Sequence, residues 1–313
     1  MSITVFKNFV DFEDNSFDEN AYYSKFMETN VIISAKSSFI EFPENPGSPL
    51  TIKYVFKGSE NYYLGSRKYK VDAQNFLVLN EFQKYSSRID SESTESFSVF
   101  FKPEYLRASI TSLIKPADKL LNDGPNPAPG PGGINFFETL YPANGRILAI
   151  LHDLKSMIHS GEGSEIRWEE MLYLLIGELL FSNRELHKEA ERVKAVKPST
   201  RLEIYRKMRT ARDYIESGLN EKVTLSNIAK AVCMCEFHLL REFRKFYGQT
   251  PYQMLISKRL EYAKILLEIP GKTISEIAAE SGFEYLSSFS ESFAKHFMIT
   301  PSQYRNAQKV NLR

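Results

Sequence analysis

The first 120 residues carry short runs in which apolar and polar positions alternate, or in which apolar residues follow one another. Val, Ile, Tyr and Phe dominate these runs, and clusters of Gly, Pro, Asn and Ser separate them. Short, evenly spaced segments of this kind are typical of β-strands in a sandwich or small barrel. The runs lie at residues 30–36, 50–58, 60–71, 75–81 and 96–102. We therefore expect a β domain at 1–121, ending in a helix over 104–121 that Pro116 interrupts.

The pattern changes after residues 122–133, where four Pro and four Gly predict a loop. Apolar residues then recur at intervals of three and four, which predicts a helical connector at 134–195. Its first helix should bury one face, made of Ile147, Leu148, Leu151, Leu154 and Ile158. Its second helix is apolar nearly all round from Met171 to Phe181, so several sides must be covered. Two interpretations stay open: a core helix under the β domain, or a helix shared with a second subunit.

Beyond a short hinge at 196–200, a helical pattern is written twice, about fifty residues apart. In each copy a short helix is followed by a turn and a longer helix, the arrangement of a helix-turn-helix motif. The first helices begin at Thr224 and Thr273, and Glu276 completes a capping box in the second copy, whereas Asn227 is a weaker counterpart in the first. The apolar positions that match are Leu225, Ile228, Ala229, Leu239, Phe243 and Pro251 with Ile274, Ile277, Ala278, Phe289, Phe293 and Pro301.

The two turns differ. Gly282 in the second turn is free to adopt a positive φ, whereas Cys233 stands where a Gly is expected in the first. A helical hairpin is by itself more often a packed pair than a DNA reader, but charge changes the picture. Residues 1–124 carry a net charge of −3, residues 125–200 carry −2 and residues 201–313 carry +6, which sum to the +1 of the chain. Both motifs thus lie in the basic third. Polyanion binding is one interpretation of this charge, and a solvated basic face is the other.

Other features narrow the function classes. The chain has no apolar run long enough to span a membrane, and its acidic start does not resemble a signal peptide, so we expect a cytoplasmic protein. Cys233 and Cys235 are too close for a disulfide framework; a redox or metal-sensing role is the less favoured interpretation. No His precedes His152, so a metal-dependent enzyme in the β domain is not expected, and neither is a cofactor or a metal site.

The C-terminal sequence TLSNIAKAV…HLLREFRKFYGQTPYQMLISKRLEYAKILL…TISEIAAESGFEYLSSFSESFAKHFMITPSQYR resembles the DNA-binding domain of the AraC/XylS family of bacterial transcription regulators. The resemblance covers Tyr205 to Arg305. Its most specific marks are Arg259, Ala263, Leu266, Leu267, Ile277, Ala278, Gly282, Phe283, Phe293, Pro301, Tyr304 and Arg305. More loosely, the N-terminal region resembles the cupin-like effector domains of that family. The resemblance implies an α+β chain: a cupin-like β-barrel or sandwich, a helical connector, and an all-α domain with two helix-turn-helix motifs at 200–307.

By the same resemblance, exposed positions of each second helix meet DNA. In the first motif these are Glu236, Phe237, Leu240, Arg241, Arg244 and Lys245. Arg241 suits guanine recognition, Phe237 a thymine methyl, and Arg244 and Lys245 phosphates. In the second motif they are Tyr285, Leu286, Ser287, Ser290, Glu291 and Lys295. Here Glu291 and Ala294 replace basic residues usual in the family, and Met298 replaces its usual Gly at the helix end.

The sequence therefore predicts a sequence-specific regulator that binds promoter DNA, is not an enzyme, and dimerises through its connector. A small-molecule effector is expected in the β domain, and RNA polymerase is an expected partner if the chain activates transcription. Two alternatives are kept. In one, the β domain binds no small molecule and only dimerises or contacts proteins; in the other, a cupin enzyme is fused to a DNA-binding tail. The effector-binding residues stay unassigned, because aromatic residues such as Tyr54, Phe56, Tyr62, Tyr63 and Tyr69 suit a sugar-stacking pocket or a dry core equally well.

Overall fold

The computed structural model describes residues 3–9, 18–45, 47–114, 135–161, 163–193 and 197–311. The chain forms two compact units, Met1–Arg206 and Lys207–Arg313. The Pro/Gly-rich loop expected at 122–133 and the last part of the helix expected over 104–121 lie outside the described residues. The hinge expected at 196–200 is shorter than predicted, because α6 (Pro198–Ser217) already begins at Pro198. Proline is favoured in the first turn of a helix, where its missing N–H has no partner to lose.

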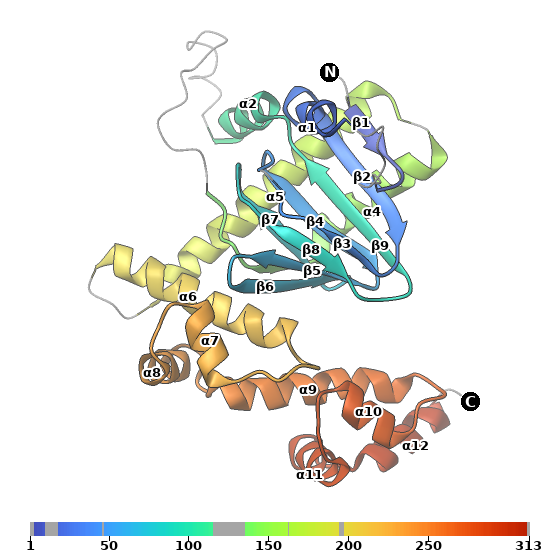
Figure 1. The fold of residues 1–313 in the computed structure, drawn as a ribbon, viewed down its shortest axis with the longest axis vertical. Helices are drawn as coiled ribbons and strands as arrows, with labels where there is room; N and C mark the ends of the chain where they lie inside the picture. Colours follow the sequence, from blue (N-terminus) through green and yellow to red (C-terminus); the bar gives the residue numbers. More distant parts are fainter. Residues whose placement is uncertain are drawn as a thin grey trace. The chain divides into compact units, whose positions relative to one another are not determined.

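Two β-sheets form the framework of the N-terminal unit (Figure 1). The six-stranded sheet has the order β1-β2-β9-β4-β7-β10 and the four-stranded sheet the order β3-β8-β5-β6. The strands are β1 (Ile3–Phe6), β2 (Asn30–Ser37), β3 (Ile40–Phe42), β4 (Thr51–Lys57), β5 (Ser59–Leu64), β6 (Arg67–Asp72), β7 (Asn75–Leu79), β8 (Ser86–Ile89), β9 (Thr94–Phe100) and β10 (Leu140–Pro142). Each run predicted from the sequence overlaps one or two of them, whereas β1, β3 and β8 lie outside the predicted runs. The strand β10 lies inside the stretch expected to be a helical connector, where it pairs with β7.

The two sheets share one hydrophobic core, which confirms the predicted barrel or sandwich. Its buried residues are Val55, Tyr62, Leu64, Tyr69, Val71, Leu77, Leu79, Tyr85 and Leu140. They come from β4, β7 and β10 of one sheet and from β5, β6 and the segment before β8 of the other. Tyr69 is fully buried and its hydroxyl donates to the carbonyl of Glu138, so this ring belongs to the core.

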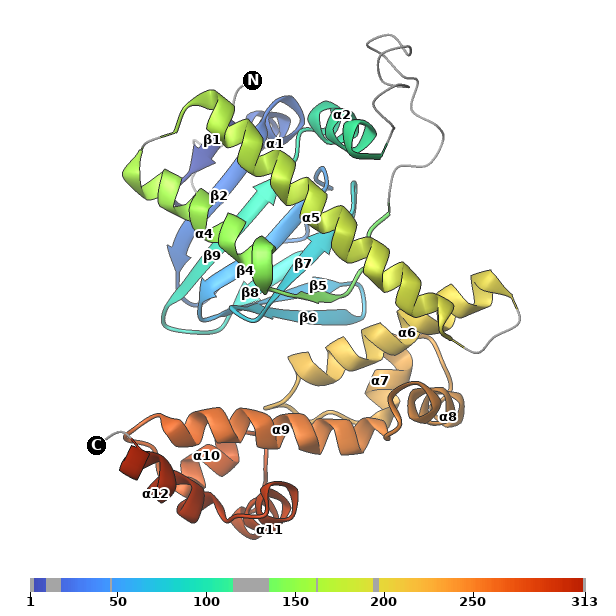
Figure 2. The same cartoon turned by 180° about the vertical axis from the view of Figure 1, so that it is seen from behind.

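Helices α4 (Gly145–Ser160) and α5 (Glu165–Glu191) cover one face of the six-stranded sheet, as Figure 2 shows. The predicted inner face of α4 is confirmed at four positions, while Leu148 is only half-buried and Ile150 and Met157 are buried in addition. On α4, His152 packs its ring against Phe56 of the sheet. On α5, Leu172, Leu175, Ile176 and Leu179 are buried, while Phe181 is 61% exposed. The helix is therefore part of the core on one side, and an exposed aromatic residue remains on another. Helix α2 (Pro103–Ile114) packs beside α5.

Helix α1 (Glu19–Glu28) was not expected, because the sequence around it is polar and acidic. Asp18 caps it by accepting a hydrogen bond from the backbone N–H of Ala21 at 3.0 Å. Phe26 anchors the helix in a cluster with Val31, Ile33, Ala35 and Phe100 of the six-stranded sheet. Packing against the sheet thus stabilises a segment whose own hydrophobic pattern is weak.

Helices make up the described part of the C-terminal unit. They are the end of α6, then α7 (Leu225–Ala231), α8 (Glu236–Tyr247), α9 (Pro251–Glu268), α10 (Ile274–Glu280), α11 (Leu286–Phe297) and α12 (Pro301–Asn311). The pairs α7–α8 and α10–α11 are the two predicted helix-turn-helix motifs, and α9 connects them (Figure 1). The second motif packs on α9 through a core that includes Leu260, Ala263, Phe289 and Phe293. In the described part of the chain, no helix has both the length and the apolar character needed to cross a membrane.

Candidate functional site

The first motif is fixed in place by local rules. Thr224 caps α7 by accepting from the backbone N–H of Asn227 at 3.2 Å, as predicted, and Asn227 makes no return bond. Cys233 adopts a φ of +50° in the turn, the left-handed conformation that favours glycine. On α8, Leu239 and Phe243 are fully buried and anchor the helix to its neighbours. The face opposite these two side chains is free to contact a partner.

The structure places the six predicted DNA-contacting residues of α8 on its exposed surface. They are Glu236, Phe237, Leu240, Arg241, Arg244 and Lys245. Phe237 is 76% exposed. Three cationic side chains and two apolar ones are therefore exposed on a single helix.

Glu242 is a residue of this surface that sequence reasoning missed. Its carboxylate is only 13% exposed and accepts from Arg241 Nε at 3.1 Å and from Lys245 Nζ at 3.0 Å. The His238 Nε2 atom lies 3.8 Å from the same oxygen. Burial acts to raise the pKa of Glu242, but the hydrogen bonds and charges of Lys245 and Arg241 outweigh it and hold the pKa below its ordinary value. The spacing of 238, 242 and 245 on one helix face was the available signal.

The second motif has stronger caps and a different surface. Thr273 and Glu276 form the predicted capping box, in which each residue's side chain accepts from the other's backbone N–H. The helix α11 is anchored by the fully buried Phe289 and Phe293. Of its predicted contact residues, five are exposed and Ser290 is half-buried; the exposed ones are Tyr285, Leu286, Ser287, Glu291 and Lys295. Among the predicted contact residues, this surface carries one lysine and one carboxylate, whereas α8 carries three cations and one carboxylate.

Gly282 lies at a close contact between the turn of the second motif and the loop after α6. Its φ is +84°, and a Cβ placed there would lie 2.2 Å from the carbonyl oxygen of Leu219. Arg259 of α9 donates to the same carbonyl at 2.7 Å and to that of Glu221 at 2.8 Å. The arginine therefore ties the loop after α6 to α9, with the second turn packed against it. These contacts give Arg259 and Gly282 structural roles.

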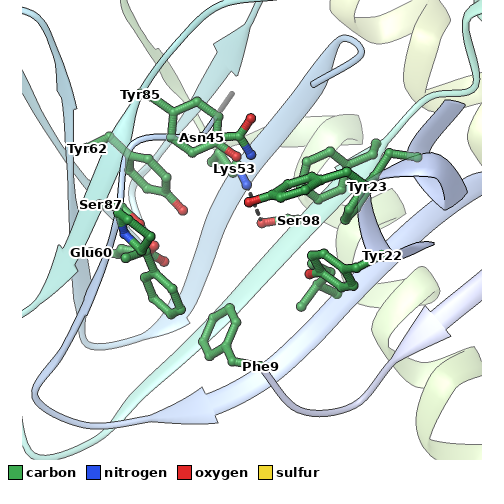
Figure 3. A pocket seen from close by; sticks show the side chains of 15 residues that line it. Phe9, Tyr22, Tyr23, Asn45, Lys53, Glu60, Tyr62, Tyr85, Ser87 and Ser98 are labelled. Carbon is green, nitrogen blue, oxygen red and sulfur yellow. Dashed lines mark hydrogen bonds between the residues drawn. The ribbon is translucent and has the colours of Figure 1, made fainter. Parts of the chain in front are cut away.

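A cavity of about 70 Å³ lies in the N-terminal unit, between the two sheets and α1. Figure 3 shows Lys53 directed at Ser98, with Glu60 and Tyr62 on one side and Tyr22 and Tyr23 on the other. Tyr62 is thus the one of the five aromatic residues considered above that lines this cavity. Among the described residues, no cluster of three or more His, Cys, Asp or Glu could hold a metal ion, and Cys233 and Cys235 are exposed, unbridged thiols.

Comparisons with known proteins agree with the C-terminal architecture. Residues 228–307 match the model of a helix-turn-helix domain family. The lactose operon transcription activator of Staphylococcus xylosus is 32% identical over 99 residues, which are 32% of this chain and 36% of that protein. The probable transcriptional regulator LumQ of Photobacterium leiognathi is 30% identical over 93 residues, which are 30% of this chain and 38% of that protein. The chain thus spans well under half the length of these curated relatives.

Solved structures resemble this chain in part or over most of its length. An AraC-type regulator from Chromobacterium violaceum is 29% identical, covering 33% of this chain and 91% of that one, with a TM-score of 0.32. ToxT from Vibrio cholerae, solved with an unsaturated fatty acid bound, is 17% identical, covering 88% of this chain and 94% of that one, with a TM-score of 0.36. Both scores are below 0.5, so the assignment rests on sequence. The C-terminal unit is therefore similar to the helix-turn-helix domains of transcription regulators, and this supports the predicted resemblance to the AraC/XylS family.

Proposed function

We propose that this regulator recognises specific promoter sequences through α8 and, more weakly, through α11. The observation that supports the proposal most is the division of each second helix into two faces. One face is anchored by two fully buried side chains, and the other is exposed to solvent in both motifs. A helix held in this way can enter a major groove without disturbing the fold.

The chemistry of α8 suits a reading helix. The Arg241 guanidinium can donate two hydrogen bonds to guanine, and Phe237 offers an apolar ring for a thymine methyl. Arg244 and Lys245 supply positive charge for phosphates, which adds affinity without sequence choice. Because Glu242 holds the side chains of Arg241 and Lys245, both need less ordering when DNA binds. Arg241 is thus the residue from which we expect most of the discrimination.

The surface of α11 favours a weaker contribution. Glu291 repels phosphate, although a carboxylate can accept a hydrogen bond from cytosine N4. Ser287 and Ser290 donate or accept without strong preference, and Lys295 is the one exposed cation among the predicted contacts. The two motifs are therefore proposed to read unlike half-elements of one asymmetric site. A homodimer and contacts with RNA polymerase would extend this proposal.

A selection from random-sequence DNA, made with the full chain at two salt concentrations, tests the proposal. We expect enrichment of a site with two half-elements about one helical turn of DNA apart, near 10 base pairs. The preferred sequence should persist at the higher salt, although affinity falls because the release of counterions becomes less favourable as the salt concentration rises. Binding without any preferred sequence, or abolished uniformly by salt, would contradict base reading by α8.

The N-terminal unit is proposed to bind a small effector in the cavity between its sheets. The cavity supports this role over that of a unit which only dimerises, because its wall includes buried polar groups as well as aromatic rings. A ligand that binds only the folded unit raises the melting temperature in a thermal-shift screen. If compounds of every chemical class leave the melting temperature unchanged, the alternative of a unit that serves only contacts is favoured.

A further inference from the structure

Two buried residues of opposite formal charge line the cavity of the N-terminal unit. Lys53 of β4 is 5% exposed and Glu60 of β5 is 2% exposed, and they belong to different sheets. Lys53 Nζ donates to Ser98 Oγ at 3.2 Å, and Glu60 Oε2 accepts from Ser96 Oγ at 2.7 Å. No ion pair within 4.0 Å joins these two described residues. Tyr62 is also hydrogen-bonded to Glu60 and to Ser98. A carboxylate and an ammonium with these partners still keep capacity for further hydrogen bonds.

The surroundings of Lys53 are mainly aromatic. Its ammonium lies 4.3 Å from the ring centre of Phe100, 5.0 Å from that of Tyr85 and 5.8 Å from that of Tyr62. These rings stabilise the cation in part, but they accept no conventional hydrogen bond from it. Burial lowers the pKa of Lys53 from 10.5 to about 8, and the charge of Glu60 acts in the opposite direction. Lys53 is therefore a buried ammonium that is still mostly charged at pH 7.

The remaining wall restricts the body of a ligand. Phe9, Tyr22, Tyr23, Phe26 and Phe42 also line the cavity. The small polar groups Asn45 and Ser87 also face it. A flat or compact apolar body fits between rings of this kind, whereas an extended polar chain would leave its own groups without partners.

We propose that the effector is a small organic anion that also carries a hydrogen-bond donor next to its acidic group, as a 2-hydroxy or 2-amino carboxylate does. Its carboxylate would accept from Lys53, its donor would bond to Glu60, and its apolar body would lie among the rings. This inference depends on the proposed effector role of the cavity. A neutral ligand would leave the buried ammonium with no counter-charge in direct contact with it. An anion lacking a donor would place its charge near Glu60 with no hydrogen bond to offset the repulsion.

The test uses the full chain and three matched probes that share a phenyl group. Mandelate has both a carboxylate and a hydroxyl, phenylacetate lacks the hydroxyl, and benzyl alcohol lacks the carboxylate. The same series is repeated with isobutyl and methyl in place of phenyl, and monosaccharides and nucleosides form a neutral arm. Calorimetry at pH 7 should show binding of a hydroxy acid at least about tenfold tighter than that of its acid partner, and weaker still for the alcohol.

Three variants assign the contacts. We expect Lys53→Met to weaken hydroxy-acid binding at least tenfold, and Glu60→Gln to reduce the preference for the hydroxy acid over the plain acid. The matched control Lys57→Met, at an exposed position of the same strand, should bind as the wild type does. Melting curves verify that each variant is folded. Binding that is equally tight in Lys53→Met would overturn the inference.

The pH dependence gives an independent readout. Raising the pH from 7 to 9.5 deprotonates Lys53, so hydroxy-acid binding should weaken by roughly tenfold or more. The other titratable groups on the cavity wall are Glu60, Tyr22, Tyr23, Tyr62 and Tyr85. Burial raises the pKa of Tyr22, Tyr62 and Tyr85, so these stay neutral over that range. Loss of binding at pH 9.5 in wild type, with no further loss in Lys53→Met, supports the inference.

The remaining outcomes separate the two proposals. If a neutral sugar or nucleoside binds and the acids do not, the effector role stands and the anionic class is wrong. If no member of either arm binds or raises the melting temperature, both the class and the effector role of the cavity are contradicted. If phenylacetate and mandelate bind equally tightly, the acid contact is retained and the inferred donor to Glu60 is wrong.

Discussion

In the first motif α8 carries Arg241, Arg244 and Lys245, whereas the matching positions of α11 carry Glu291, Ala294 and Lys295. The buried positions of the two helices instead correspond closely: Leu239 and Phe243 match Phe289 and Phe293, and all four are fully buried. The same frame thus supports two unlike surfaces. Packing restricts the inner face because a change of volume there is destabilising, while the outer face is free to diverge.

The turns of the two motifs have similar backbone conformations, but they differ in the space that they leave for a side chain. Cys233 and Gly282 occupy matching positions with φ of +50° and +84°. The Cys233 side chain is exposed to solvent, so the left-handed backbone conformation is the only feature that disfavours a side chain at this position. At Gly282 the carbonyl of Leu219 and the guanidinium of Arg259 fill the space that a side chain would need. Both the backbone conformation and the neighbouring atoms therefore favour glycine in the second turn, whereas the backbone conformation alone favours it in the first.

A substitution in the second turn should have the largest effect on stability. In Gly282→Ala the new Cβ would lie 2.2 Å from a backbone carbonyl, in a left-handed conformation. We expect the C-terminal unit to lose at least about 3 kcal/mol, a large part of the stability of a small domain. Hydrogen exchange of the α9 amides, measured by mass spectrometry on the full chain, should show protection reduced more than about 100-fold.

Gly248→Ala is the matched control for that substitution. Gly248 ends α8 with a φ of +72°, and a Cβ there would meet no atom within 4 Å. The cost is then that of the backbone conformation alone, about 1 kcal/mol. Conversely, Cys233→Gly should be neutral or slightly stabilising. Equal effects of Gly282→Ala and Gly248→Ala would show that the contact with Leu219 does not constrain the second turn.

Substitutions on the exposed surfaces of α8 and α11 should change DNA affinity to different extents. Arg241→Ala should weaken binding to the selected DNA site by roughly 10- to 100-fold, since a bidentate contact with guanine contributes about 1–3 kcal/mol. Glu291→Ala should change affinity by about threefold or less, because it removes a carboxylate that repels phosphate. Fluorescence anisotropy with sites mutated in one half-element at a time measures both effects.

The control for charge is Lys222→Ala, which removes one cation from an exposed position outside both second helices. It should leave base preference unchanged. Arg241→Ala should remove the preference within a single half-element and leave the other intact. A uniform loss across all sites would instead show that Arg241 contacts phosphate, and a larger loss in Glu291→Ala than in Arg241→Ala would reverse the proposed ranking of the motifs.

Local rules explain why so much of the C-terminal unit could be predicted from its sequence. A threonine cap, an interval of three or four between apolar residues and a glycine in a turn act within a few residues of one another. Because the motif occurs twice, each of these local patterns could be compared between the two copies. The predicted caps at Thr224 and Thr273 and the anchors on α8 and α11 were found accordingly.

The features that sequence reasoning missed depend on contacts between distant segments. Helix α1 is held by β2 and β9 rather than by its own pattern. Lys53 and Glu60 are brought to one cavity only when two sheets pack face to face. A lysine between Ile52 and Tyr54, in a strand that reads as fully buried, was the signal available for the cavity. The cavity could not be predicted from β4 alone, because other residues that line it lie on β5, β8 and β9.

The smallest expected effect concerns the ends of α8 and α11, where Gly248 in one motif corresponds to Met298 in the other. Met298 adopts a φ of 60° and donates its backbone N–H to the carbonyl of Ala294 at 2.8 Å, so it closes the helix as glycine does in the first motif. Its side chain is 88% exposed and contributes little packing. Met298→Gly removes a left-handed strain of about 1–2 kcal/mol, while glycine adds freedom to the unfolded chain worth up to about 1 kcal/mol. We therefore expect a net stabilisation of about 0.5–1 kcal/mol, seen as a several-fold rise in protection of the α11 amides. A destabilised Met298→Gly variant would show that the exposed methionine makes a contact that offsets its backbone strain. The ends of α8 and α11 would then be stabilised by different interactions.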